Sequence, residues 1–453
     1  MTIISGTFAG KRYAVLGLAR SGLATVECLA ASGAHVTAWD TREEARAAVA
    51  DKAELADPLT IDLNGFDGVV VSPGVPLNRH PITEYAAQAG VPIIGDIELF
   101  ALARPTLPPH KVVGITGTNG KSTTTALIHH IIETAGIPTR MGGNIGLPIL
   151  GQEPLEPGVN GVGIYVLELS SYQIDLTHSL ACDVAVLLNI TPDHLDRYDG
   201  FAGYVASKAR LFDMQTPGQV RVIALDDDNT RAIAAQNDDK AGDGEVERDE
   251  IGVHTADVGA DEQARWPALQ GPHNAQNVAA ARAATRALGI SEDVIERGLA
   301  TYAALPHRMQ RVAEVNGVLY VNDSKATNAA STAPALGAWP ATVNGPRIHW
   351  IVGGLPKADH LDECVPYYPN IKAAYTIGEA GPMFADLLAP HMPVDSCEML
   401  ITAVNHAAKV AQPGDVVLFS PACASFDQFR DYEARGDAFA AAVRALENEG
   451  QGG

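Results

Sequence analysis

The hydrophobic pattern divides the chain into short apolar runs, each followed by a longer segment of helical character. Three strands are predicted near the amino end, at Arg12–Leu16, His35–Trp39 and Gly68–Val71, with helices over residues 23–31 and 83–89. Short apolar runs bounded by turn residues are typical of buried strands, and their alternation with helices indicates parallel sheets with right-handed crossovers. The sequence therefore predicts an α/β fold.

The same alternation continues along the rest of the chain. Further strands are expected at residues 112–115, 164–167, 184–188, 318–321, 348–352, 373–377 and 416–419, and helices at 126–132, 206–212 and 278–287. The charged stretch 237–250 lacks aromatic residues and is expected to be an exposed, mobile loop. A chain of 453 residues suggests about three domains, which we place at residues 1–97, 98–306 and 307–453.

Composition excludes some classes of function. The net charge of −22 argues against general nucleic-acid binding, which requires a basic face. No run of 18 apolar residues and no signal-like segment is present, so we expect no membrane partner and a cytoplasmic location. The five cysteines show neither a CxxC pair nor metal-ligand spacing, and are predicted to be buried thiols in a reducing compartment. We expect a monomer.

The clearest candidate chemistry lies in the sequence GTNGKST, residues 117–123, between a predicted strand and a predicted helix. A glycine-rich turn in this context is typical of a phosphate-binding loop, although the spacing is shorter than the common GxxxxGK[ST] form. Backbone N–H groups and the helix N-terminus would hold phosphates. Lys121 would reach the β- and γ-phosphates and Ser122 would bind Mg²⁺. The alternative is a turn with an exposed lysine.

A second glycine-rich turn, residues 17–22, follows the first strand. It matches GxGxxG with the middle glycine replaced by Ala19, and Asp40 ends the next strand at the spacing of a ribose-binding acid. Residues 72–75 follow the third strand at the same expected edge. The broken pattern favours a nucleotide diphosphate over a dinucleotide, with plain strand-to-helix turns as the alternative.

Polar side chains also follow later strands. Glu168 offers the oxygen that Mg²⁺ prefers, whereas His194 would be a less usual ligand and, alone, more often a capping or core histidine. Lys208 lies in a predicted helix, and on sequence alone a solvated surface lysine is the alternative to a site residue. Lys325 and Lys357 follow two strands and predict a local positive site for a carboxylate or phosphate.

Eight motifs occur in order over nearly the whole chain: GTNGKST, ELSSYQ, NITPDHLDRY, GPHNAQN, PHR, NDSKATN, VGG..K and SPACASFDQF. Together they resemble the ATP-dependent Mur ligases of peptidoglycan synthesis. The motifs at residues 322–328 and 420–429 are similar to those of the D-glutamate-adding branch of that family. A set of ordered motifs is far more specific than any one of them.

The resemblance implies an N-terminal Rossmann-like domain for a UDP sugar, a central P-loop ATPase-type parallel sheet and a C-terminal Rossmann-like domain that closes over both. It implies ligation of D-glutamate to UDP-N-acetylmuramoyl-L-alanine through an acyl phosphate, with ATP and two Mg²⁺ ions. Closure of the C-terminal domain would exclude water from the active site and so protect the acyl phosphate from hydrolysis.

The resemblance also implies roles for individual residues. ATP would be held by Gly117, Thr118, Asn119, Gly120, Lys121, Ser122, Thr123, Asn274, Arg308 and Asp323. The UDP sugar would be held by Ala19, Arg20, Ser21, Asp40, Thr41, Arg42, Ser72, Pro73, Gly74, Asn144 and Gln173. Glutamate would be held by Lys325, Thr327, Lys357, Ser425 and Tyr432, with Leu355 departing from the acid of some relatives. The metal ligands would be Ser122, Glu168, His194 and a carbamylated Lys208; Lys121, Glu168, His194 and Lys208 would be catalytic.

Other functions remain open at this level. Another amide ligase of the superfamily, either an L-glutamate-adding Mur ligase or a folylpolyglutamate synthase, is the near alternative, although the folate enzyme lacks the N-terminal UDP-type domain by resemblance. An ATP-gated regulatory module would not need the charged residues that follow the strands of residues 307–453, because a switch has no second substrate to bind. An NAD-linked oxidoreductase is disfavoured by Ala19.

Overall fold

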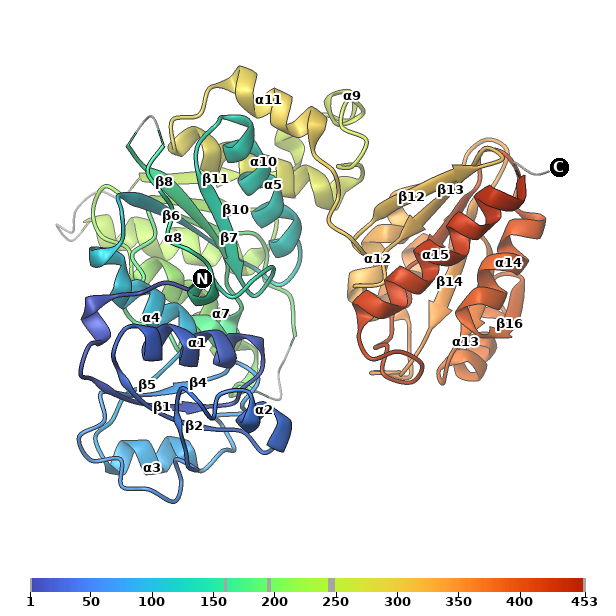
Figure 1. Ribbon diagram of the computed structural model, residues 1–453. Coiled ribbons are helices and arrows are strands. Elements are labelled where there is room, and N and C mark those ends of the chain that lie inside the picture. Colours follow the sequence, from blue (N-terminus) through green and yellow to red (C-terminus); the bar gives the residue numbers. More distant parts are fainter. Residues whose placement is uncertain (1, 159–160, 194–196, 243–248, 451–453) are drawn as a thin grey trace. The chain divides into compact units, whose positions relative to one another are not determined.

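The computed structural model describes residues 2–158, 161–193, 197–242 and 249–450 (Figure 1). The chain forms two compact units: Met1–Val258 with Gln276–Leu299, and Gly259–Ala275 with Ala300–Gly453. The first unit holds two sheets and the second unit holds one. The finer boundaries after residues 97 and 306 stay predictions.

The first sheet contains five parallel strands in the order β3-β2-β1-β4-β5. The strands are β1 (Arg12–Leu16), β2 (His35–Trp39), β3 (Glu54–Leu55), β4 (Gly68–Val71) and β5 (Ile93–Ile94), and the helices are α1 (Arg20–Ala31), α2 (Glu43–Ala47), α3 (Ile82–Gln88) and α4 (Asp96–Ala103). The three strands predicted here have the expected bounds. The strand order is that of a Rossmann-like half with its switch point beside β1.

The second sheet is also parallel, in the order β11-β10-β9-β6-β8-β7. Its strands are β6 (His110–Thr116), β7 (Thr139–Gly143), β8 (Gly163–Glu168), β9 (Val184–Leu187), β10 (Val220–Ala224) and β11 (Asp249–Val253). The helices of this region are α5 (Lys121–Thr134), α6 (Ser171–Asp175), α7 (Gly200–Asp213), α8 (Asp228–Gly242), α10 (Pro272–Ala287) and α11 (Glu292–Thr301).

The prediction of one loop over residues 237–250 was wrong at both ends. Helix α8 continues to Gly242, and the edge strand β11 begins at Asp249, where it pairs with Val220 of β10. Residues 243–248 lie outside the described residues. The sequence of this segment contains no continuous apolar run, so its composition does not reveal the helix end or the edge strand.

The first two sheets share one hydrophobic core. Val15 and Leu29 of the first sheet region belong to the same buried cluster as Phe100, Tyr165 and Leu187. Backbone hydrogen bonds join the two regions as well, from the Gly95 N–H to the Leu176 carbonyl at 2.9 Å and from the Ile3 N–H to the Leu150 carbonyl at 3.0 Å. The two sheets of the first unit are therefore packed as one body.

The third sheet has the order β12-β13-β17-β14-β15-β16, and only β12 is antiparallel to its neighbour among the described strands. Its strands are β12 (Gln310–Val315), β13 (Val318–Asn322), β14 (Ile348–Gly353), β15 (Ile371–Ile377), β16 (Val394–Glu398) and β17 (Val416–Phe419). Its helices are α12 (Ala329–Gly337), α13 (Gly381–Leu388), α14 (Leu400–Val410) and α15 (Tyr432–Gly450), and the short α9 (Ala260–Gln263) belongs to the same unit.

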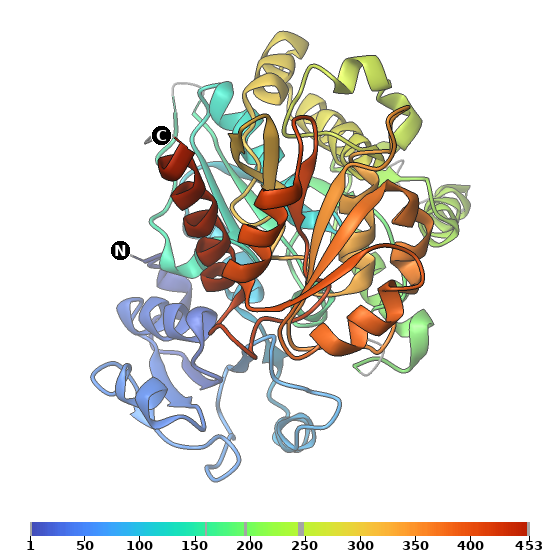
Figure 2. The same ribbon diagram turned by 90° about the vertical axis from the view of Figure 1, so that its right-hand side faces the viewer.

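Helices cover both faces of this third sheet. Leu336 of α12 and Phe384 of α13 pack in one core with Trp350, whereas Val404 of α14 and Phe439 of α15 pack in a second core on the other face. Figure 2 shows the sheet and its helices from a second direction. The arrangement confirms the predicted α/β class. In the described parts of the chain, none of the helices has both the length and the apolar character needed to cross a membrane.

Candidate active site

The phosphate-binding loop lies between β6 and α5, as predicted. Gly117 and Gly120 have φ angles of 149° and 83°, which glycine adopts without strain. A Cβ at Gly120 would lie 2.2 Å from Oδ1 of Asn277, so this position has no room for a side chain. The Lys121 ammonium donates to the carbonyls of Gly117 and Thr118 at 2.9 and 2.8 Å. Thr123 lies in the first turn of α5.

Asn189, at the end of β9, holds this loop from the neighbouring strand. Its Oδ1 accepts from the Asn119 N–H at 2.8 Å, and its carbonyl accepts from the Thr118 N–H at 2.7 Å. Its Nδ2 donates to Gln276 Oε1 at 2.8 Å, and Thr124 Oγ1 donates to Asn277 Oδ1 at 3.2 Å. Sequence reasoning assigned no role to Asn189, Gln276, Asn277 or Thr124. The polar strand end after residue 188 was the available signal.

A carboxylate and a hydroxyl meet beside the loop. Glu168 is buried at the end of β8 and accepts a hydrogen bond from Ser122 Oγ. Its other oxygen accepts from Asn144 Nδ2 at 2.7 Å, and its carbonyl accepts from the Asn144 N–H at 2.9 Å. The oxygens of Ser122 and Glu168 are the donor type that Mg²⁺ prefers. His194 lies outside the described residues.

Lys208 is a site residue by position and not a surface lysine. It lies on α7 with a fully buried side chain, and its ammonium donates to the Gly117 carbonyl at 2.8 Å. The ammonium also lies 4.6 Å from the centre of the Tyr204 ring. Burial, followed by the nearby Lys121 ammonium, lowers the pKa of Lys208 well below its ordinary value. The interpretation as a solvated lysine is wrong.

Three loops of the first sheet meet at its carboxyl edge, where the UDP sugar was predicted. Asp40 Oδ2 accepts from the Leu18 N–H at 2.7 Å, and Ser72 Oγ donates to the Gly17 carbonyl at 2.8 Å. The side chain of Arg42 donates to Asp40, and this hydrogen bond lowers the pKa of Asp40 to about 2.

Ala19, Arg20, Ser21 and Thr41, also predicted for the UDP sugar, lie on or beside these loops. Ala19 caps α1, which begins with Arg20 and Ser21, and the Thr41 carbonyl accepts from Arg46. Gln173 lies farther along the chain, where its side chain completes a capping box with Ser170 at the start of α6.

Arg197 connects the loop after β4 to the second sheet region. Its guanidinium donates to the carbonyls of Gly74 and Val75, both at 2.9 Å, and lies 4.6 Å from the centre of the Tyr172 ring. Pro73 precedes this contact. Sequence reasoning did not single out Arg197, because nothing local to NITPDHLDRY indicates contact with a segment 122 residues away.

In the second unit, the residues predicted for glutamate gather at the ends of β13, β17 and β14, which are neighbours in the sheet. Lys357 Nζ donates to Thr327 Oγ1 at 3.1 Å, and the Lys325 ammonium lies 3.9 Å from the centre of the Tyr432 ring. Two cations in adjacent loops form a site suited to a carboxylate.

Arg435 holds these loops together from α15. Its buried guanidinium donates to Ser324 and to the carbonyls of Cys423 and Ala424, at 2.8 to 3.1 Å. Burial lowers the pKa of Arg435 to about 10. Ser425 is buried beside this contact, and Leu355 pairs through its backbone with Ala424. Arg435 was also missed, since its partners are backbone groups distant in sequence.

Asp323, Arg308 and Asn274, predicted to bind ATP, also belong to the second unit. Asp323 accepts from Ser420 Oγ at 2.8 Å and from the Met309 N–H at 3.2 Å, and burial raises the pKa of Asp323 to about 7. Asn274 donates to the Gln270 carbonyl at 2.9 Å. Their contacts with ATP stay predictions.

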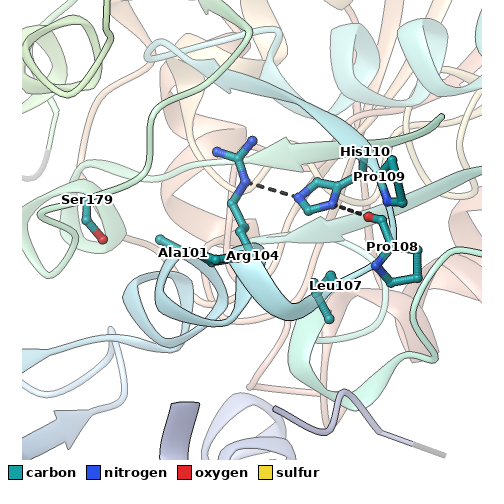
Figure 3. A pocket seen from close by; sticks show the side chains of 8 residues that line it. Ala101, Arg104, Leu107, Pro108, Pro109, His110 and Ser179 are labelled. Atoms are coloured by element: carbon teal, nitrogen blue, oxygen red, sulfur yellow. Dashed lines mark hydrogen bonds between the residues drawn. The ribbon is translucent and has the colours of Figure 1, made fainter. Parts of the chain in front are cut away.

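A separate cavity of 430 Å³ lies at the start of β6, at the opposite end of that strand from the phosphate-binding loop (Figure 3). Arg104 Nε donates to His110 Nε2 at 3.1 Å, and His110 Nδ1 donates to the Pro108 carbonyl at 2.7 Å. Since ligands of open α/β sheets bind at the carboxyl ends of the strands, this cavity is not the active site.

Family models match the three sheet regions in turn. The matches are "Mur ligase MurD-like, N-terminal domain" over residues 11–95, "Mur ligase middle domain" over 115–285, and "Mur ligase, glutamate ligase domain" over 307–423. The chain therefore belongs to the Mur ligase family, and its three-domain α/β fold is the one predicted.

Two relatives of the same name are similar to this chain over nearly its full length. The UDP-N-acetylmuramoylalanine--D-glutamate ligase of Novosphingobium aromaticivorans is 65% identical over 98% of this chain and 97% of the relative. The protein of the same name from Sphingopyxis alaskensis is 62% identical over 98% and 99%.

Solved structures share the fold at low sequence identity. MurF from Acinetobacter baumannii has a TM-score of 0.60 at 15% identity, covering 96% of this chain and 93% of that chain. MurF ligase from Thermotoga maritima in complex with ADP has a TM-score of 0.59 at 16% identity, covering 99% and 97%.

Proposed function

We propose that this protein joins D-glutamate to UDP-N-acetylmuramoyl-L-alanine at the expense of ATP, in the cytoplasmic synthesis of peptidoglycan precursors. The observation that carries the proposal is the 65% identity to a D-glutamate ligase over nearly the full length of both chains. The contacts among Lys121, Ser122, Glu168 and Lys208 support it, since phosphoryl transfer needs cations and metal-ligating oxygens at one phosphate loop.

A carboxylate resists attack by an amine and must first be activated. ATP transfers its γ-phosphoryl group to the alanine carboxylate, which gives an acyl phosphate and ADP. Lys121 spreads the charge of the transferring group, and the N-terminus of α5 adds its positive dipole end. The glutamate amine then attacks the acyl carbon and loses a proton. Inorganic phosphate leaves, and it carries one oxygen atom of the former alanine carboxylate.

The donor set beside the loop fits Mg²⁺. Ser122 presents a hydroxyl from the start of α5 and Glu168 presents a carboxylate at the end of β8, and both are buried. Bound Mg²⁺ would neutralise charge on the β- and γ-phosphates. Asn144 orients Glu168 by donating to its second oxygen.

We propose further that Lys208 is carbamylated. Reaction with CO₂ requires a neutral amine, which the lowered pKa of Lys208 provides. The ammonium first loses one proton to become the neutral amine. The Nζ–C bond to CO₂ then forms and a second proton is released, so the buried cation becomes an anion with two oxygens. This change removes the repulsion between Lys208 and Lys121 and supplies the oxygen ligands of a second Mg²⁺.

Phosphate release tests the proposal. We expect release only when ATP, UDP-N-acetylmuramoyl-L-alanine and D-glutamate are all present. L-glutamate, L-lysine and meso-diaminopimelate, offered separately, should give little product. Basal phosphate release that is independent of the UDP sugar would indicate an ATP-gated switch, and efficient use of L-glutamate would contradict the assigned substrate.

A further inference from the structure

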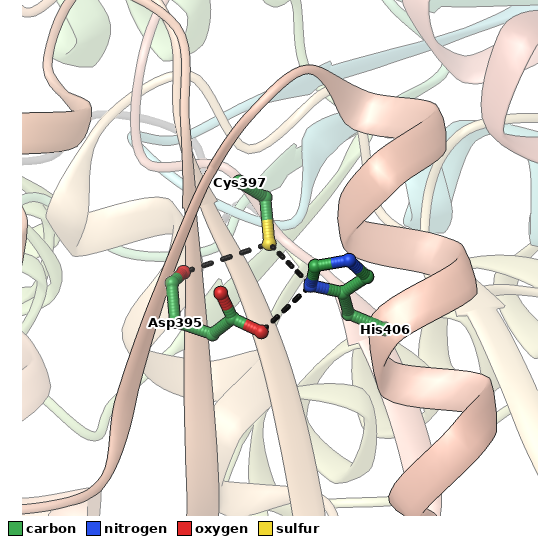
Figure 4. Close-up of side chains that lie close together, drawn as sticks. All are labelled: Asp395, Cys397 and His406. Atoms are coloured by element: carbon green, nitrogen blue, oxygen red, sulfur yellow. Dashed lines mark hydrogen bonds and ion pairs between the residues drawn. The ribbon is translucent and has the colours of Figure 1, made fainter.

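Three side chains of different chemistry converge on the edge strand β16 and helix α14 (Figure 4). Asp395 and Cys397 are two residues apart on the strand, at a place where its pairing with β15 shifts register, and both side chains contact His406. His406 of α14 lies over them: its Nδ1 is 2.8 Å from Asp395 Oδ2 and 3.7 Å from Cys397 Sγ. One donor atom from each of the three residues lies within 4.8 Å of the other two.

The geometry is not that of a nucleophilic relay. A relay places the thiol and the carboxylate on opposite nitrogens of the imidazole ring, so that a proton can pass across it. Here Cys397 and Asp395 both face Nδ1 of His406. The thiol also donates to the Asp395 backbone carbonyl at 3.6 Å. The sulfur, oxygen and nitrogen atoms are therefore clustered within 4.8 Å of one another, close enough to bind one metal ion.

We propose that Asp395, Cys397 and His406 form a binding site for Zn²⁺. Thiolate, imidazole and carboxylate are the ligands that this cation takes in proteins, and tetrahedral coordination places its ligand atoms about 3.5 Å apart. The observed S–N separation of 3.7 Å already meets this requirement. The N–O separation of 2.8 Å reflects a hydrogen bond that the ion would replace, with an opening of about half an ångström.

The three side chains differ in how deeply they are buried. Cys397 is buried, whereas the side chains of Asp395 and His406 are 45% and 40% exposed. Solvent therefore reaches the site from one side, where a water molecule would complete three protein ligands to four. This pattern is that of an open site and not of a closed structural one.

The site differs in chemical class from the Mg²⁺ site proposed beside the phosphate-binding loop. Ser122 and Glu168 supply oxygen alone, which suits a hard cation, whereas sulfur and imidazole select borderline and soft cations. The same protein would therefore bind Mg²⁺ and Zn²⁺ in different places. Zn²⁺ binding should not require nucleotide.

Co²⁺ provides the test, because a cobalt–thiolate bond gives a charge-transfer absorption that oxygen ligands do not produce. The full-length protein, freed of metal by chelation, should bind one equivalent of Co²⁺ with this absorption, and one equivalent of Zn²⁺ should abolish it. Cys397→Ser should lose the absorption. His406→Gln, at a partly exposed position where folding is not at risk, should lower the affinity at least 10-fold.

Cys364→Ser is the matched control, since Cys364 is also buried in the same unit and its thiol donates to the Ala329 carbonyl at 3.5 Å. This variant should retain one equivalent of Co²⁺ and the full absorption. Absence of the absorption in the wild type would overturn the proposal. Its persistence in Cys397→Ser, or unchanged affinity in His406→Gln, would overturn it equally. None of these outcomes bears on D-glutamate ligation.

Discussion

Lys121 and Lys208 donate to the same acceptor, the carbonyl oxygen of Gly117, at 2.9 and 2.8 Å. Two ammonium groups on one carbonyl repel each other, and Lys208 is buried as well. The arrangement is therefore costly while both lysines are charged. Loss of charge at Lys208, or its reversal, relieves that cost.

We expect Lys208→Ala to be nearly inactive if the residue is carbamylated. A short carboxylate such as acetate at high concentration should restore part of the activity, because it supplies the lost anionic oxygens. The measurement is phosphate release with and without acetate, together with a ¹³C NMR signal of the carbamate in protein equilibrated with ¹³CO₂.

Lys52→Ala is the control for the Lys208 experiment, since Lys52 is an exposed lysine that pairs with its neighbour Asp51. It should keep wild-type activity and the carbamate signal. Wild-type activity of Lys208→Ala in both ordinary and CO₂-depleted buffer would show that the carbamate has no role.

Lys121→Ala should lower kcat by about 10²- to 10³-fold, because it removes a cation from the charge that develops in phosphoryl transfer. The thermal midpoint should change little, since the lysine lies on the loop and not in the core. Acetate should give no rescue here, because a cation has been lost. Near-normal kcat would reject the assignment of the loop.

Lys325→Ala and Lys357→Ala should each raise KM for glutamate about 10- to 150-fold, the range expected for one charge-assisted hydrogen bond. KM for ATP should stay within about 2-fold. Lys409→Ala, an exposed lysine in the last turn of α14, serves as the control in the same unit. If only KM for ATP rises, that lysine belongs to the nucleotide site.

Arg197→Ala should raise KM for the UDP sugar by about 10-fold or more. The substitution removes two hydrogen bonds to the loop at Gly74 and Val75, each worth about 1 kcal/mol. KM for glutamate should not change. Arg231→Ala, which removes an exposed pair with Asp228, should leave all constants unchanged. A selective effect on glutamate would contradict the role given to Arg197.

Asp323 predicts a pH dependence of stability. Burial raises the pKa of Asp323 to about 7 in the folded protein, above the value of about 3.9 in an unfolded chain. The unfolded state ionises first, so the contribution of Asp323 to stability falls as pH rises from about 4 to 7. Asp323→Asn should gain stability relative to wild type over that window, by on the order of 2–4 kcal/mol.

Denaturant unfolding at several pH values measures this difference. Asp386→Asn, at an exposed aspartate of α13, should show no growing difference from wild type. A gap between wild type and Asp323→Asn that stays constant from pH 4 to 7 would show that Asp323 does not titrate there.

The sequence predicts strands best where both faces are buried. The strands β1, β2, β4 and β17 have the predicted bounds because each consists mostly of apolar residues and is followed by a turn residue. The edge strand β16, whose sequence is VDSCE, has no such run. It is held by backbone pairing with β15, which local composition does not report.

The residues of the candidate site also fall into two groups: those that a local sequence motif predicts, and those that only the folded structure brings together. Lys121 and Ser122 are predictable because a phosphate loop is a local motif between a strand and a helix. Arg197 and Arg435 act on backbone carbonyls from distant segments, so their roles exist only after folding. The burial of Lys208 likewise depends on how α7 packs and not on its own sequence.

The core shared by the first two sheets limits how the chain can be divided. A fragment ending after α4, at Ala103, would expose Phe100 and Leu29, and would lose the hydrogen bonds that Gly95 and Ile3 make with the second sheet region. Such a fragment should aggregate. A chimera that exchanges the N-terminal region with a relative must therefore carry the facing segments around Leu150 and Leu176 as part of the same graft.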